Sequence, residues 1–185
     1  EPEGRWIVDP LDGTTNFLHG LPHWAISIAL EQAGGIVAGV VFDPLKDELF
    51  WAERGHGAYV NSRQLRISRK EDLTESLFAT GMPFKGRGDQ DTTMAEIEKV
   101  AFASAGVRRF GSAALDLAYV AAGRYDGYWE RGLAAWDIAA GALIANEAGG
   151  RVTDLNGGEK IVSDRSIIVA GPMIYDQFFN LVTKA

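Results

Sequence analysis

The chain has 185 residues, and 25 acidic against 18 basic side chains give a formal net charge of -7 with the three histidines neutral. A hydrophobic content of 46% and a charged content of 23% are typical of a folded globular protein with a sizeable core. The acidic balance argues against a general nucleic-acid binder. Because there is no cysteine, disulfides, thiolate zinc sites and every mechanism with a cysteine nucleophile are excluded.

No apolar run approaches the roughly 20 residues that a membrane-spanning helix needs, the run at 35–42 being one of the longest. No charged and then apolar leader opens the sequence. We therefore expect a soluble, cytoplasmic protein without a membrane partner.

The first half of the sequence predicts strands. Apolar runs rich in strand-forming residues occupy 5–8, 24–30, 35–42 and 48–52, and a hairpin is predicted from 57–60 and 64–67 with its turn at Asn61-Ser62. The first run is predicted to end at Asp9, because Pro10 cannot continue a strand ladder. Short glycine- and proline-containing connections between the others indicate an antiparallel meander.

The second half alternates between helical and extended patterns. Helices are predicted at 94–102, 112–122, 137–148 and about 172–182, and strands at 126–130 and 166–170. In the first helix the spacing places Met94, Ile97, Ala101 and Phe102 on one buried face with charges opposite. The whole predicts a layered α/β or α+β unit, with a β-rich half at 1–84, an α/β half at 85–185 and a boundary in the polar segment 85–89.

Two carboxylates stand close together where the first strand is predicted to end. Asp12 follows Asp9 after a turn at Pro10, so both side chains can converge on one cation, and the Leu11 carbonyl can complete the shell. A hard divalent ion such as Mg²⁺ prefers such oxygen ligands. The alternative is a structural turn and helix cap, since Asp-Pro and Asp-Gly pairs are common in turns.

A phosphate subsite is predicted directly after these carboxylates. Gly13, Thr14 and Thr15 offer free backbone N–H groups at the expected start of a short helix, which is how many proteins hold a phosphate. A second acidic pair lies far along the chain, with Glu130 at a strand end and Asp137 at a helix start. Taken alone, Asp137 is typical of an N-cap and Glu130 of a solvated strand end.

Other chemistries fit the spacing less well. Phosphatases that form an aspartyl phosphate place two aspartates two positions apart, whereas Asp9 and Asp12 are three apart. The sequence has neither a Gly-x-Ser-x-Gly elbow nor a Gly-x-x-x-x-Gly-Lys loop. His19 and His23 have the spacing of zinc-binding helices, but Gly20 and Pro22 between them favour a loop.

The segment 6–17, WIVDPLDGTTNF, resembles the first signature of the inositol monophosphatase family. The segments 136–141, WDIAAG, and 146–150, NEAGG, resemble its second signature, and 108–115 and 128–130 also fit. The resemblance covers essentially the whole chain and is strongest to the bacterial branch. It implies the layered αβαβα sugar-phosphatase fold of that family, in which no protein nucleophile is needed.

The resemblance also implies a role for each matching residue. Asp9 would bridge two metals, the Leu11 carbonyl would bind the first, and Asp12 and Asp137 would bind the second, with two or three Mg²⁺ ions in all and Mn²⁺ or Ca²⁺ as substitutes. Substrate-binding residues would be Leu11, Asp12, Gly13, Thr14, Gly111, Ser112, Ala113, Glu130 and Asp137. The catalytic set would be Asp9, Asp12 and Thr14, whose hydroxyl would orient the attacking water.

The function implied is hydrolysis of an inositol monophosphate, a small sugar phosphate, by a homodimer that lithium inhibits. Another sugar phosphate or a nucleotide is the alternative substrate, and a regulatory role near the transcription machinery is the alternative function. Family members carry a further metal-binding glutamate in a region before the first signature, and this chain does not contain that region. We therefore expect the N-terminal part of the fold to be missing and the activity of this chain alone to be reduced.

Overall fold

A computed structural model describes residues 4–83 and 89–184, and within them the first half forms one antiparallel sheet of six strands. Neighbours in the sheet follow the chain order, β1 (Arg5–Asp12), β2 (Ala25–Gln32), β3 (Gly35–Asp43), β4 (Glu48–Glu53), β5 (Ala58–Val60) and β6 (Arg63–Gln64). The predicted meander is confirmed, as is the turn at Asn61-Ser62. Leu65 and Ile67, predicted to be in the last strand, lie beyond it but are buried.

A second, mixed sheet of five strands combines one strand near the end of the predicted half 1–84 with four strands from the rest of the chain. Its order is β10 (Arg151–Thr153), β11 (Ser166–Ala170), β9 (Gly127–Arg131), β7 (Leu77–Thr80) and β8 (Gly106–Arg108). β7 runs parallel to β8 and β9, whereas β11 is antiparallel to both of its neighbours. The pattern predicted β9 and β11 but missed the other three, because runs of three or four residues are too short to show a period.

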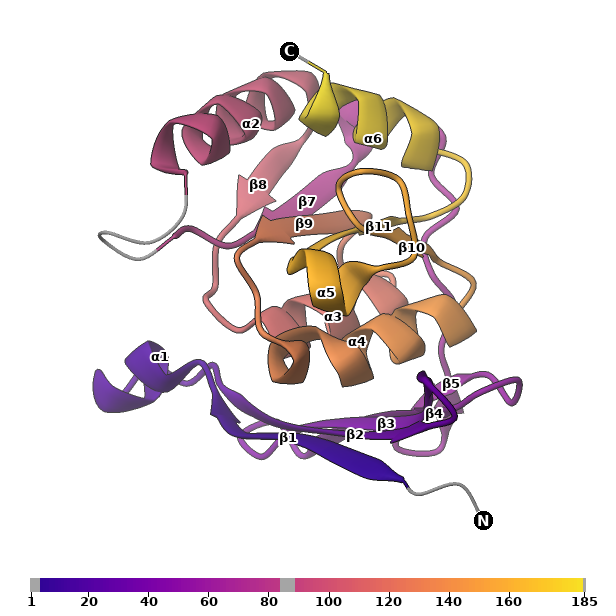
Figure 1. Ribbon diagram of the computed structural model, residues 1–185. Coiled ribbons are helices and arrows are strands. Elements are labelled where there is room, and N and C mark those ends of the chain that lie inside the picture. The colour runs from indigo at the N-terminus through magenta and orange to yellow at the C-terminus, as the bar shows by residue number, and fades with distance from the viewer. Residues whose placement is uncertain (1–3, 84–88, 185) are drawn as a thin grey trace.

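Helices separate the sheets and cover the second one. They are α1 (Thr14–Leu18), α2 (Gln90–Ala103), α3 (Ala113–Ala121), α4 (Ala135–Glu147), α5 (Ile161–Asp164) and α6 (Tyr175–Thr183), and a single 3₁₀ turn spans Leu73–Glu75. α3 and α4 lie between the two sheets, and α2 and α6 lie on the far side of the second sheet (Figure 1). The described residues thus form four layers of the predicted layered fold.

The α4 helix packs closely because small residues face its neighbours. A Cβ on Gly39 of β3 would lie 2.9 Å from the Ala140 Cα, and a Cβ on Gly141 would lie 2.6 Å from the Leu117 Cβ. Such distances are shorter than van der Waals contact, so glycine is required at both places. The close approach places the middle of α4 against β3 of the first sheet and against α3. Within the described residues, no helix is long and apolar enough to cross a membrane.

The predicted buried face of α2 is wrong except at Ile97, which packs against the core. Met94 is 54% exposed and Phe102 is 86% exposed, whereas Glu96, predicted to face solvent, is 3% exposed. The Glu96 carboxylate accepts hydrogen bonds from the Trp129 indole at 3.0 Å and from the Arg131 guanidinium at 2.9 and 2.7 Å. A buried carboxylate with these partners overrides the apolar pattern, because the ion pair satisfies its charge.

The last helix begins at Tyr175 rather than near Pro172, because residues 172–174 form a turn before it. The predicted boundary at 85–89 falls almost entirely outside the described residues. The division into halves at 84 and 85 therefore stays a prediction.

Candidate metal and phosphate site

The β1 strand does not end at Asp9, as the sequence predicts, but continues through Pro10 to Asp12. Asp9 pairs with Ser27 and Asp12 pairs with Ala25, so three steps along β1 match two steps along β2. This register shift is a β-bulge at a proline, which has no N–H for the ladder. In a regular strand, residues three apart face opposite sides. The bulge therefore brings both carboxylates to the inner face of the sheet.

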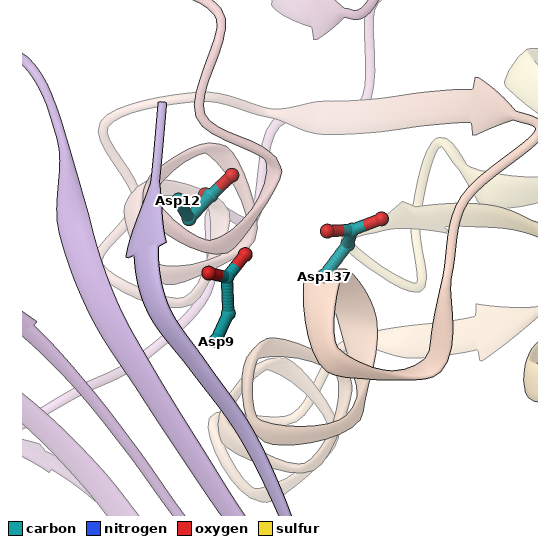
Figure 2. Close-up of side chains that lie close together, drawn as sticks. All are labelled: Asp9, Asp12 and Asp137. Atoms are coloured by element: carbon teal, nitrogen blue, oxygen red, sulfur yellow. The ribbon is translucent and has the colours of Figure 1, made fainter. Parts of the chain in front are cut away.

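Asp137 joins them from the other side of the cleft. It lies in the first turn of α4, and its Oδ2 accepts a hydrogen bond from the Ala134 backbone N–H at 2.7 Å. One ligand atom each from Asp9, Asp12 and Asp137 lies within 4.8 Å of the other two (Figure 2). Asp137 therefore both caps the start of α4 and converges with the other two carboxylates, as expected of a metal site.

The surroundings of Asp12 show what these carboxylates need. Asp12 is 8% exposed, and its Oδ2 accepts hydrogen bonds from the Ser112 hydroxyl at 2.6 Å and from the Ala114 N–H at 2.8 Å. Burial, and to a smaller extent the charges of Asp9 and Asp137, raise the pKa of Asp12 to about 6. Burial also raises the pKa of Asp137. A divalent cation fits this oxygen-only set, because it would offset the repulsion that opposes ionisation.

The segment after Asp12 has the form predicted for a phosphate loop. Gly13 has φ +87°, in the left-handed region that favours glycine, and α1 begins at the next residue. The Thr14 hydroxyl donates a 2.8 Å hydrogen bond to the Leu11 carbonyl. Asp9 in turn accepts the Leu11 N–H at 3.0 Å, which stabilises the bulge. Loop and carboxylates are thus held by the same short hydrogen-bonded segment.

A cleft of about 1040 Å³ opens over these groups. All of the residues singled out in the sequence line it, namely Asp9, Leu11, Asp12, Gly13, Thr14, Gly111, Ser112, Ala113, Glu130 and Asp137. They come from the end of β1, the start of α3, β9 and the start of α4. Segments separated by more than 100 residues therefore form one concave surface, which is the usual form of a small-molecule site.

Glu130 is not the solvated strand end that the sequence alone favours. It is partly buried, and its carboxylate accepts a hydrogen bond from the Tyr128 hydroxyl. Burial raises the pKa of Glu130 from 4.5 to about 7, although the Tyr128 hydrogen bond opposes the shift. The cleft thus holds a further acceptor that is separate from the three converging carboxylates.

Sequence reasoning missed two acidic residues of the cleft, Asp116 and Asp164, of which Asp116 is the more deeply buried. Asp116 is 1% exposed on α3, and its Oδ1 has no hydrogen-bond partner among the described residues. Burial and the nearby Glu130 raise the pKa of Asp116 well above its ordinary value. An aspartate within the alanine- and leucine-rich segment 113–121 is the signal that could have identified it.

Comparison with known proteins assigns the family. The model of the inositol monophosphatase family matches residues 2–184. An inositol-1-monophosphatase of Mesorhizobium japonicum is 52% identical over 184 residues, which cover 100% of this chain and 69% of the relative. A Pseudomonas aeruginosa protein named Nus factor SuhB is 49% identical over 168 residues, covering 90% of this chain and 62% of the relative.

A solved structure agrees with these matches. The extragenic suppressor protein suhB from Bartonella henselae superposes with a TM-score of 0.95 at 51% sequence identity, covering 99% of this chain and 71% of that one. The chain thus spans about two thirds of the length of the relatives it matches. On fold, carboxylate geometry and sequence identity, the chain belongs to the inositol monophosphatase family, a family of phosphatases.

Proposed function

We propose that the protein is a Mg²⁺-dependent phosphomonoesterase that hydrolyses an inositol monophosphate to inositol and phosphate. The observation that carries the proposal is the convergence of Asp9, Asp12 and Asp137 within 4.8 Å, next to a glycine loop at the start of α1. Phosphate ester hydrolysis needs a dianion to be bound and neutralised and a water to be placed in line with the leaving oxygen. This cleft offers groups for each task.

The residues that would hold the metal are Asp9, Asp12, Asp137 and the Leu11 carbonyl, and we expect two or three Mg²⁺ ions, with Mn²⁺ or Ca²⁺ able to replace them. When bound, such ions neutralise the phosphate and make a water more acidic. The Ser112 hydroxyl and the Ala114 N–H hold one oxygen of Asp12, at 2.6 and 2.8 Å. The other oxygen is left to face the cation.

Thr14 and Gly13 act on the phosphate and the water. Their backbone N–H groups lie at the start of α1 and would donate to the phosphate oxygens. The Thr14 hydroxyl already donates its proton to the Leu11 carbonyl at 2.8 Å. Its oxygen lone pairs therefore remain able to accept a hydrogen bond from the attacking water and so orient it.

The opposite wall of the cleft would bind the alcohol part of the substrate. Glu130 offers carboxylate oxygens to ring hydroxyls, and Gly111, Ser112 and Ala113 line the same cleft. A polyol matches an acceptor of this kind better than an apolar alcohol does, since hydroxyls donate hydrogen bonds. Another sugar phosphate or a nucleotide remains the alternative substrate.

A regulatory role in transcription is the second candidate, and the name of the Pseudomonas aeruginosa relative, Nus factor SuhB, supports it. Such a role would need no carboxylate triad, and the chain has one. The triad therefore favours the enzyme. A homodimer, lithium inhibition and a cytoplasmic location stay predictions of the same proposal.

The test is release of phosphate from inositol 1-phosphate with Mg²⁺, measured on the complete polypeptide that contains these residues. Asp137→Asn should lower turnover on the order of 100-fold or more. Its fold should persist, because an asparagine oxygen can still accept the Ala134 N–H. Asp89→Asn is the matched control, since Asp89 also accepts an N–H at a helix start, from Thr92 at 3.0 Å, but does not line the cleft. Full turnover by Asp137→Asn would refute the proposal.

A further inference from the structure

Asn16, a buried residue of α1, joins two walls of the cleft. It is 7% exposed, and its side-chain Nδ2 donates hydrogen bonds to the His23 carbonyl at 2.8 Å and to the Phe110 carbonyl at 2.7 Å. Both acceptors are backbone carbonyls, so the amide orientation is fixed, because only the NH₂ group can serve both. Each proton of that group is thereby used.

The two carbonyls belong to segments that border the proposed site. The His23 carbonyl also lies against Gly13, where an added Cβ would be 3.0 Å from it. Phe110 directly precedes Gly111, whose φ of +84° starts the wall that carries Ser112 and Ala113. Asn16 therefore connects the phosphate loop, three residues before it, to the wall that would hold the alcohol part of the substrate.

A second connection between these walls has a different character. The Ser112 hydroxyl donates to Asp12 Oδ2 at 2.6 Å, and Asp12 is itself one of the converging carboxylates. The strength of that hydrogen bond depends on what the Asp12 carboxylate binds. The Asn16 connection does not line the described part of the cleft and involves none of the three carboxylates. It can therefore set the separation of the walls independently of the cation.

We propose that Asn16 is a positioning residue that sets the spacing between the phosphate loop and the wall at 111–113, and thereby selects polyol over other leaving groups. This rests on the proposed function and adds a determinant of its specificity. Hydrogen bonds of this kind also stabilise the fold, so a purely structural effect is expected as well. A positioning effect depends on which substrate is used, whereas a loss of stability lowers activity on all substrates alike.

Asn61 provides a matched control for the structural part. In the turn after β5, its Oδ1 accepts the Leu49 N–H at 2.9 Å and its Nδ2 donates to the Asp47 carbonyl at 3.1 Å. Like Asn16 it makes two side-chain hydrogen bonds to the backbone, although one of them is accepted and not donated, and it lies away from the cleft. Asn16→Asp and Asn61→Asp both turn a donor into a charged acceptor that faces a carbonyl. Asn16→Ala removes the donors without adding charge and serves if Asn16→Asp does not fold.

The experiment compares kcat/KM for inositol 1-phosphate with kcat/KM for p-nitrophenyl phosphate, which lacks ring hydroxyls, at saturating Mg²⁺. We expect the ratio of the two to fall on the order of tenfold in Asn16→Asp or Asn16→Ala, through a higher KM for inositol 1-phosphate. The ratio should stay at its wild-type value in Asn61→Asp. Equal losses on both substrates, or an unchanged ratio, would overturn the inference.

Failure of the proposed function gives a different result. If the wild-type protein hydrolyses neither ester with Mg²⁺, the proposed function is refuted. The positioning claim is then decided by amide hydrogen exchange of Gly111, Ser112 and Ala113. Faster exchange at these amides in Asn16→Ala, with wild-type rates in Asn61→Asp, supports it, and unchanged rates overturn it.

Discussion

The hydroxyl of Ser112 lies 2.6 Å from Asp12 Oδ2, so the N-cap of α3 and the last residue of β1 hold each other in place. The same Ser112 oxygen accepts the Leu115 N–H at 3.4 Å, and the Ala114 N–H donates to Asp12. One carboxylate thus completes the start of a helix and faces the cleft. Stability and cation binding are coupled at this pair.

Replacing Ser112 with alanine should therefore affect both properties. Loss of the cap and of the hydrogen bond to a buried carboxylate should lower the free energy of unfolding by about 2 kcal/mol, measured by urea denaturation in EDTA. The affinity for Mg²⁺ should fall as well, because Asp12 loses a partner that orients it. Ser112→Thr, which keeps a hydroxyl, should lie close to wild type. A drop in stability with unchanged Mg²⁺ affinity would contradict the coupling.

Glu130→Gln should stabilise the metal-free protein, and the gain should depend on pH. Because burial raises the pKa of Glu130 from 4.5 to about 7, the folded state holds this proton more tightly than the unfolded state does. Its contribution to stability therefore falls as pH rises from about 4.5 through about 7 and is constant above. We expect a gain of about 2 kcal/mol at pH 8 and little at pH 5. Equal gains at both pH values would show that charge is not the cause.

Mg²⁺ should raise the melting temperature of the wild-type protein, and EDTA should reverse the effect. A ligand at 100 times its dissociation constant stabilises the folded state by about 2.7 kcal/mol. Asp9→Asn should lose most of this shift, because Asp9 is one of the three converging carboxylates. Asp72→Asn, which alters an exposed carboxylate that accepts the Thr74 N–H, should keep it. An unchanged shift in Asp9→Asn would refute the assignment of these ligands.

Glu96→Ala should be the most destabilising change at the second sheet. It would leave the Trp129 indole without its 3.0 Å acceptor and the Arg131 guanidinium without its ion pair. The expected loss is about 2 kcal/mol in the free energy of unfolding, since the buried indole N–H loses its acceptor and the Arg131 side chain, itself 40% exposed, loses its ion pair. Glu98→Ala, at an exposed position on the same helix, should change stability by less than about 0.5 kcal/mol. Similar losses for both variants would contradict the role of Glu96.

Local chemistry made much of this fold predictable. Alternating apolar residues with turn signals at Gly34 and Pro44 were sufficient for the antiparallel meander, since each strand pairs with the next one along the chain. α3 could be delimited because Ser112 and Gly123 are typical of its two ends. The short strands β7, β8 and β10 could not be predicted, because their place depends on neighbours that are distant in sequence.

The site was predictable where a motif is continuous and not where it depends on tertiary contacts. Asp9 and Asp12 lie in one segment, so their joint role could be predicted, whereas the reason for their convergence could not. The cleft position of Asp116 and the burial of Glu96 depend on partners more than 10 residues away, such as Glu130 and Trp129. A buried carboxylate leaves no periodic signal in its own helix.

The bulge at Pro10 changes which residues of β1 share a face of the sheet. Along an unbroken ladder, Asp9 and Asp12 would lie on opposite faces, and the extra residue corrects this. Deleting Leu11 would leave the two aspartates two residues apart, where regular pairing with Ser27 and Ala25 keeps both on the inner face without a bulge. What the extra residue adds is therefore Leu11 itself, whose N–H donates to Asp9 and whose carbonyl accepts the Thr14 hydroxyl, and a shorter connection would keep the two carboxylates together but lose that carbonyl.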